Sequence, residues 1–296
     1  MRIIAGHPKA VRRNRPTGAA FFTTLLLGVL LSIPAARSHE EARVHKLGSG
    51  LITFSGMIAE LIDQRVVFVG EKHNDPWHHQ TQLHVISSLH QNSVPLAIGL
   101  EMFTARDQRF LDAWVGGKIS EQEFVRVFQQ NWGFAWPLYR DIFLYARQER
   151  IPLFGLNVPR SITQKVAAKG VQALSDRELD DLPPNISCDL DARYKKFIRR
   201  LFHFKESSER TFNNFCEAQV VWDQAMAWHL ADYLKRYPDR RVVVLAGAVH
   251  AWKYGIARQL QKYADVTSVV ILPDLPADYR DISQQDADYF LLPSAF

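Results

Sequence analysis

Residues 65–76 read RVVFVGEKHNDP and combine a strand, a turn and the start of a helix. The run Arg65–Gly70 is apolar and continuous rather than alternating, which is typical of a strand buried on both faces of a parallel sheet. Asp75 is a good N-cap and Pro76 suits the first helical position, so we expect a helix to begin there. A strand that leads directly into a helix is the building unit of α/β domains.

Four further runs share this strand pattern, being short, apolar and bounded by turn residues. They are Leu96–Leu100, Ile151–Leu156, Arg241–Ala246 and Val266–Leu272. Helical patterns separate them, so the sequence predicts an α/β fold with a mostly parallel central sheet flanked by helices. The long helical connections, about 104–150 and 160–238, predict a helical subdomain inserted between strands of a single domain, residues 39–296.

The first 38 residues have the three parts of a secretory signal peptide. A cationic stretch precedes the 16-residue apolar run Gly18–Ile33, and small residues follow Pro34. The expected cleavage lies before His39, and an uncleaved anchor is the alternative. No cysteine follows the apolar run before Cys188, which argues against a lipid anchor. We therefore expect secretion across the inner membrane, to the periplasm or in association with the outer membrane.

The distribution of charge limits the possible partners. The whole chain carries a formal net charge of +5, but residues 1–38 hold six cations and no acid. The remainder has 30 basic and 31 acidic side chains, a net charge of −1. The basic balance thus belongs to the leader and gives no reason to expect nucleic acid as a partner. An oxidising compartment would permit Cys188 and Cys216 to pair, although two separate buried thiols are equally compatible with the sequence.

Titratable side chains follow several of the predicted strands at their carboxyl ends, where open parallel sheets bind ligands. Glu71 and His73 follow the first strand, Glu101 ends the second, and His250 follows the fourth. Imidazole and carboxylate groups suit a divalent transition metal such as Mn, Fe, Co or Zn, which could activate water. Asn157 and Arg160, after the third strand, are candidate orienting residues.

Each of these residues also has a structural interpretation. His73 could cap the turn before Asp75, Glu101 could form a buried salt bridge with Arg160, and His250 could bind a helix end. Any one of the residues alone is best explained in this way. Their recurrence at corresponding strand ends favours a polar functional site.

Two further segments suggest a ligand. Residues 131–145, NWGFAWPLYRDIFLY, hold six aromatic side chains, which indicate either a helix-packing core or the wall of a site for a flat, apolar ligand. Residues 193–205, RYKKFIRRLFHFK, place Tyr194 on an apolar helical face beside several cations. This segment predicts either a solvated basic face or a haem site, since tyrosinate binds ferric iron and cations bind propionates. Our candidates there are Tyr194, His203, Arg199 and Arg200, with Tyr139 as a second tyrosine.

These motifs together resemble the ChaN family of haem-binding uptake proteins, within the group that includes Tiki proteases and erythromycin esterases. The matching pieces, in order, are VVFVGEKHND (66–75), GLEMF (99–103), FAWPLYR (134–140), PLFGLNVPR (152–160), EAQVVWDQAMA (217–227) and LAGAVHAWKYG (245–255). The last two pieces include Asp223, a further orienting candidate, and His250.

The resemblance implies an α/β domain, a role in bacterial haem or iron acquisition, and haem held at a homodimer interface with a tyrosine ligand. It also implies that His73 and Glu101 correspond to the metal-binding residues of the Tiki group. A haem-uptake receptor or transporter is the expected partner. We therefore expect a haem-binding protein of the envelope that is not primarily an enzyme. The alternative is a metal-dependent hydrolase that uses Glu71, His73, Glu101 and His250, and a third possibility is an interaction module without catalysis.

Overall fold

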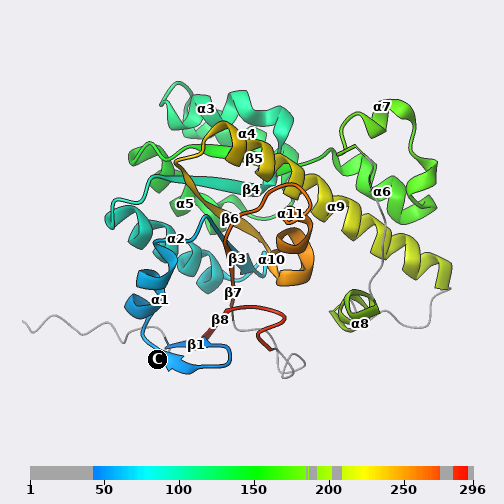
Figure 1. The fold of residues 1–296 in the computed structure, drawn as a ribbon. Helices are drawn as coiled ribbons and strands as arrows, with labels where there is room; N and C mark the ends of the chain where they lie inside the picture. Colours follow the sequence, from blue (N-terminus) through cyan, green and yellow to red (C-terminus); the bar gives the residue numbers. More distant parts are fainter. Residues whose placement is uncertain (1–42, 185, 187–191, 202–208, 274–282, 293–296) are drawn as a thin grey trace, which may run out of the picture. The chain divides into compact units, whose positions relative to one another are not determined.

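The computed structural model describes residues 43–184, 186, 192–201, 209–273 and 283–292. Within them an eight-stranded sheet has the order β2-β1-β8-β7-β3-β6-β4-β5 (Figure 1). The five predicted strands are present as β3 (Val66–Glu71), β4 (Leu96–Thr104), β5 (Leu153–Asn157), β6 (Arg241–Gly247) and β7 (Ser268–Pro273). These five strands pair in parallel, which confirms the predicted α/β fold class.

Three short strands extend the sheet beyond β7. They are β1 (Arg43–Lys46), β2 (Gly50–Ile52) and β8 (Tyr289–Leu292). β8 runs parallel to β7, whereas β1 is antiparallel to both β8 and β2. Strands of three or four residues are too short to produce a recognisable hydrophobic period, and the sequence did not predict them.

The central strands are buried on both faces, and successive side chains enter opposite hydrophobic cores. In β3, Val67 and Val69 join the core on one face, and Val66 and Phe68 join the core on the other. The first face is covered by α1 (Phe54–Leu61), α2 (Pro76–Gln91), α3 (Gln108–Val115), α4 (Glu121–Asn131) and α5 (Trp136–Gln148). Because each strand is covered twice, its apolar run is continuous.

The second face is covered by helices from the connections between β5 and β6 and between β6 and β7. They are α8 (Ala192–Leu201), α9 (Glu209–Arg236), α10 (Ala248–Ala251) and α11 (Arg258–Leu260), with the π-helical turn η3 (Lys253–Ala257). The helix α6 (Arg160–Lys169) packs against α9 around a third apolar cluster, and the short α7 (Asp176–Leu179) follows it. The 3-10 turns η1 (Ala105–Asp107) and η2 (Val171–Ala173) complete the described helical elements.

Local capping explains where the helices begin. The side chain of Asp75 accepts a hydrogen bond from the amide of Trp77 and caps α2, as predicted. Ser120 and Glu123 form a capping box at the start of α4. Pro137 occupies the first turn of α5, where its missing N–H group costs nothing.

Some of the predicted features lie outside the described residues, namely the leader 1–38, Cys188 and His203. Cys216 is buried and forms no disulfide within the described part of the chain. Among the described helices, none combines the length and the apolar character that crossing a membrane requires.

Candidate functional site

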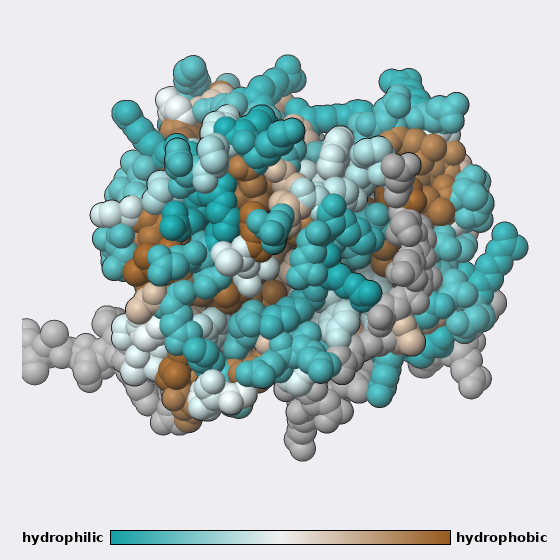
Figure 2. Space-filling model, viewed as in Figure 1, coloured by the Kyte–Doolittle hydropathy of each residue, from teal (hydrophilic) through white to brown (hydrophobic). Residues whose placement is uncertain are grey.

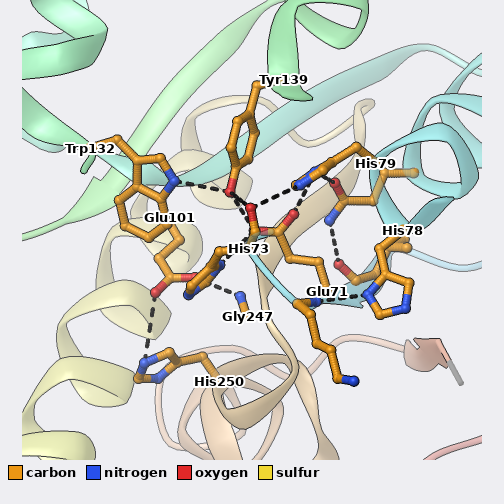
Figure 3. A network of polar contacts seen from close by, with 12 residues as sticks. Glu71, His73, His78, His79, Glu101, Trp132, Tyr139, Gly247 and His250 are labelled. Atoms are coloured by element: carbon orange, nitrogen blue, oxygen red, sulfur yellow. Dashed lines mark hydrogen bonds and ion pairs between the residues drawn. The ribbon is translucent and has the colours of Figure 1, made fainter. Parts of the chain in front are cut away.

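The carboxyl ends of β3, β4 and β6 bring the predicted strand-end residues into one network of polar contacts (Figure 3). Glu71 is the last residue of β3, and Glu101 lies in β4 where the pairing with β5 shifts register. Such irregularities re-aim side chains near functional sites. Gly247 ends β6, and His250 follows in α10.

Glu71 is the centre of the first half of this network. Its Oε1 atom lies 2.7 Å from Nδ1 of His73 and accepts a 2.9 Å hydrogen bond from the hydroxyl of Tyr139. Its Oε2 atom lies 2.7 Å from Nδ1 of His79. Glu71 is 2% exposed, so Oε1 exchanges its hydration for two hydrogen-bond partners, while Oε2 is buried beside the ring of His79 without a well-aligned hydrogen bond.

The surroundings of His79 fix its charge. Nδ1 faces Oε2 of Glu71 and also Oε1 of Gln82 at 3.3 Å, and Nε2 faces the carbonyl oxygen of His73 at 3.3 Å. The amide of Gln82 is oriented by its own hydrogen bond to the carbonyl of Val69. Both ring nitrogens therefore meet acceptors, and only an imidazolium ion can donate to both.

The pKa shifts of this half of the network agree with that assignment. Burial alone would raise the pKa of Glu71, but the hydrogen bonds from His73 and His79 outweigh it and lower the pKa to about 2. Burial alone would lower the pKa values of His73 and His79, but the hydrogen bonds to Glu71 raise both. Burial and the nearby charge of Glu71 raise the pKa of Tyr139, so its phenol stays protonated.

Glu101 forms the second half of the network. Its Oε2 atom accepts a 2.6 Å hydrogen bond from the amide of Gly247, and its Oε1 atom lies 3.7 Å from Nε2 of His250. Asn157 donates to the backbone carbonyl of Glu101 at 2.7 Å. The alternative salt bridge between Glu101 and Arg160 is not formed within the described residues, where Arg160 lies exposed at the start of α6.

A chain of hydrogen bonds supports His250 from behind. Its Nδ1 atom lies 2.7 Å from Oδ1 of Asp223, and Oδ2 of Asp223 accepts a 3.3 Å hydrogen bond from the hydroxyl of Tyr194. Burial raises the pKa of Asp223 to about 6 despite these partners. Burial alone would lower the pKa of His250, but the charges of Asp223 and Glu101 raise it.

His73 stands between the two halves. Its ring lies beside the carboxylate of Glu101 (Figure 3), and Gly247 provides the space for it. A Cβ atom added at Gly247 would lie 2.7 Å from Cε1 and 3.1 Å from Nε2 of His73. Trp132 and Phe134 flank the ring on its other sides, with centroid distances of 4.9 and 4.7 Å.

The residues predicted for haem occupy different surroundings. The hydroxyls of Tyr139 and Tyr194 are buried and donate to carboxylates, and burial raises the pKa of both. Arg199 is exposed on α8, pairs with Glu209 at 3.2 Å, and lies over the ring of Phe212. The side chain of Arg200 and the whole of His203 are outside the described part of the protein.

Sequence reasoning missed His79, Trp132 and Gly247 as members of this network. His79 lies in the first turn of the helix that begins at Pro76, six residues after His73, and that position was the available signal. Trp132 belonged to the aromatic stretch and, like Trp136, Tyr139 and Phe143, is buried in the core on the first face of the sheet. A glycine that accommodates a neighbouring ring has no distinctive sequence pattern.

The network is arranged to hold protons. Within the described residues, no group of three or more His, Cys, Asp or Glu side chains is placed to hold a metal ion. His73 and His250 instead each direct Nδ1 at a buried carboxylate, which fixes the tautomer and strengthens Nε2 as a base or ligand.

Comparison with solved structures finds a similar fold in ChaN of Campylobacter jejuni, described by the words "cofacial heme binding". The two chains are 21% identical with a TM-score of 0.68, and the match covers 86% of this chain and 97% of that one. The type III effector HopBA1 matches with 14% identity, 80% and 90% coverage and a TM-score of 0.46. A mutant of the erythromycin esterase EreC matches with 14% identity, 80% and 78% coverage and a TM-score of 0.47.

A search among curated proteins finds no match. A family profile described as "Haem-binding uptake, Tiki superfamily, ChaN" matches residues 57–260. The matched region contains all of β3–β6 and the whole polar network, and it confirms the resemblance that the ordered motifs indicated. The chain therefore belongs to the ChaN family of haem-binding uptake proteins, in the Tiki superfamily.

Proposed function

We propose that this protein binds haem in the bacterial envelope and assists the uptake of haem or iron. The observation that carries the proposal is the family match over residues 57–260, which contains the central strands β3–β6 and every residue of the strand-end network. The leader supports the envelope location, because it has the composition of a secretory signal. A homodimer and a haem-uptake receptor or transporter as partner are part of the same proposal.

The side chains at the strand-end network suit haem. Haem needs a nitrogen or oxygen ligand for iron, apolar surface for the porphyrin, and cations for two propionates. His73, Trp132 and Phe134 offer the first two of these, since the side chain of His73 is 27% exposed and its ring lies against both aromatic rings. Lys72 and Arg160 lie at the same edge of the sheet and have no carboxylate partner among the described residues.

Titration with hemin tests this function. We expect the protein from residue 39 onward to shift and sharpen the Soret band until binding saturates. Light scattering with and without hemin would measure whether two copies associate, and fractionation of cells would measure the location. A hemin spectrum that the protein does not change would contradict haem binding, whatever the outcome of the other two measurements.

A second candidate function is a hydrolase centred on His250. The observation that favours it is the pairing of His250 with buried Asp223, with Glu101 on the other side of the ring. A histidine supported in this way can take a proton from water as a general base. A transition metal does not fit the described arrangement, so we assign it no step.

Two measurements test the hydrolase. Elemental analysis of purified protein would detect Mn, Fe, Co or Zn, and a panel of ester and peptide substrates would detect turnover. We expect any turnover to be lost in His250→Ala. The absence of turnover, or turnover that this substitution leaves unchanged, would contradict the candidate.

A further inference from the structure

The helix α8 carries its positive charge on one side. It holds five basic residues and no acidic one, namely Arg193, Lys195, Lys196, Arg199 and Arg200. At about 100° per residue, these five positions lie on the side of the helix opposite Tyr194 and Ile198. Tyr194 and Ile198 are buried, so their side faces the protein and the basic side is the outer one. Lys196 and Arg199 are exposed there.

The inner side of α8 is used within the protein. The hydroxyl of Tyr194 donates to Asp223, the ring of Phe197 stacks on Trp252, and Ile198 packs in the core of the second face. The large apolar side chains described for this helix therefore serve the fold. What α8 offers to a partner is charge.

The positive charge of α8 contrasts with the rest of the chain after the leader. Residues 39–296 hold 30 basic side chains, of which five belong to α8, and 31 acidic ones. The remainder therefore holds 25 basic and 31 acidic side chains and is net negative. A cationic helix on an otherwise acidic protein creates a field that turns α8 toward an anionic surface.

The two lysines of α8 are not neutralised by acidic side chains. Among the described residues, neither Lys195 nor Lys196 forms an ion pair. Arg199 pairs with Glu209 at 3.2 Å, but both side chains are well exposed, at 43% and 67%. An exposed pair of this kind is weak, so it leaves Arg199 available to a stronger anionic partner.

The large hydrophobic side chains that are exposed in the described part of the chain are scattered. They are Leu51, Phe134, Leu179 and Tyr237, on four separate segments. Figure 2 shows a face on which hydrophilic side chains predominate and hydrophobic ones form separate patches. Insertion into a bilayer needs a continuous apolar face, so this surface favours attachment through charge.

We propose, on the basis of the envelope location proposed above, that the outer side of α8 binds the anionic headgroups of a phospholipid bilayer. Lysine is a flexible, strongly hydrated point charge, which suits mobile phosphate groups. An acidic protein would be expected to need an apolar centre in its interface, and the outer side of α8 offers charge alone. The attachment is electrostatic and reversible, and it holds the protein at the membrane surface.

Co-sedimentation with lipid vesicles tests this inference. The protein from residue 39 onward is used, because residues 40–296 form a compact unit and the apolar run of the leader would itself enter a bilayer. We expect binding to vesicles of phosphatidylethanolamine and phosphatidylglycerol at low salt. Replacing phosphatidylglycerol by phosphatidylcholine should abolish it, and added salt should release the protein because salt screens the charges.

A double variant assigns the binding to α8. Lys195→Gln with Lys196→Gln should weaken binding to the anionic vesicles by about tenfold or more, since each cation near such a surface contributes roughly a fivefold factor. Lys118→Gln with Lys235→Gln is the matched control, because it removes the same charge at two exposed positions on other segments. The control should change binding by less than about twofold. Thermal unfolding checks that both double variants are folded.

Three outcomes would overturn the inference. They are equal weakening by the two double variants, equal binding to neutral vesicles, and no binding to either kind of vesicle. If polyglutamate binds through Lys195 and Lys196 while anionic vesicles do not, the partner of α8 is an acidic protein instead. Hemin titration keeps the proposed function separate: Lys195→Gln with Lys196→Gln should bind hemin unchanged, and a failure of the unaltered protein to bind hemin would leave the vesicle result standing.

Discussion

Nδ1 of His79 lies 2.7 Å from Oε2 of Glu71, and both side chains are at least 97% buried from solvent by surface area. This ion pair joins the start of α2 to the end of β3, the two elements that residues 65–76 connect. It stabilises Glu71 as a carboxylate, which accepts the hydrogen bond from Nδ1 of His73.

Removing the imidazolium should strongly destabilise the fold. In His79→Leu the carboxylate of Glu71 loses its charged partner inside the protein, and breaking such a buried pair costs about 3–5 kcal/mol. Urea unfolding at neutral pH measures the change in the free energy of unfolding. Glu121→Gln is the control, because it removes one member of the exposed pair with Arg140 and should change the free energy of unfolding little. Equal effects of the two substitutions would contradict the assignment.

The pH dependence of stability should show the same ion pair. The pKa of Glu71 falls from 4.5 to about 2 on folding, which corresponds to about 3 kcal/mol. That contribution is fully present above pH 4.5 and is lost as the pH falls toward 2. The raised pKa values of His73 and His79 act in the opposite direction, since their contribution is present below pH 6.5 and is lost as the pH rises through their folded values.

Unfolding measured over a pH series checks this prediction. In Glu71→Gln the free energy of unfolding should fall less as the pH drops from 4.5 toward 2. It should also fall less as the pH rises above 6.5, because both histidines lose the carboxylate that raises their pKa. If the loss of unfolding free energy at acidic pH is unchanged in Glu71→Gln, then other carboxylates cause it.

A methyl group at position 247 should displace the ring of His73. The added Cβ would lie 2.7 Å from Cε1 of His73, closer than carbon atoms pack, and overpacking of this kind costs about 1–3 kcal/mol. We expect Gly247→Ala to lower the melting temperature and to shift the ring resonances of His73 in NMR spectra. Gly133→Ala is the matched control, because nothing lies within 4 Å of its Cβ position. Unchanged His73 resonances in Gly247→Ala would contradict the geometry.

Replacing the carboxylate behind His250 should make that histidine easier to deprotonate. The negative charges of Asp223 and Glu101 raise the pKa of His250, whereas burial lowers it. Asp223→Asn removes one of these charges, so the effect of burial weighs more. NMR titration of the His250 ring should therefore give a lower pKa in the variant. Asp232→Asn, on the same helix but in an exposed ion pair with Arg236, should leave that pKa unchanged.

The sequence was most informative where local chemistry and burial agree. The five central strands could be predicted because double burial makes them continuous apolar runs, and the start of α2 could be placed from the N-cap at Asp75. Parallel pairing then placed Glu71, Glu101 and His250 at one edge of the sheet, since the carboxyl ends of such strands share an edge.

What sequence could not predict depends on three-dimensional packing. The partners of Glu71 come from α2 and α5, and no local pattern states that Tyr139 on α5 reaches the end of β3. The basic helix was read correctly as amphipathic, but burial of Tyr194 follows from its position against α9 and α10, which only the folded chain defines. The short strands β1, β2 and β8 were missed because each is only three or four residues long.

The pairing of β1 with β8 has a consequence for how the chain folds. The register that joins Val44 to Leu291 closes a loop of about 250 residues, and pairings this distant in sequence form slowly because the entropy cost of closing the loop precedes the contacts. The central strands β3–β7 are longer and carry most of the buried apolar residues of the sheet, so they can assemble without the β1–β2 hairpin. The β1–β2 hairpin would then dock last and come away first, which makes this edge of the sheet the part to monitor for early opening under denaturant or force.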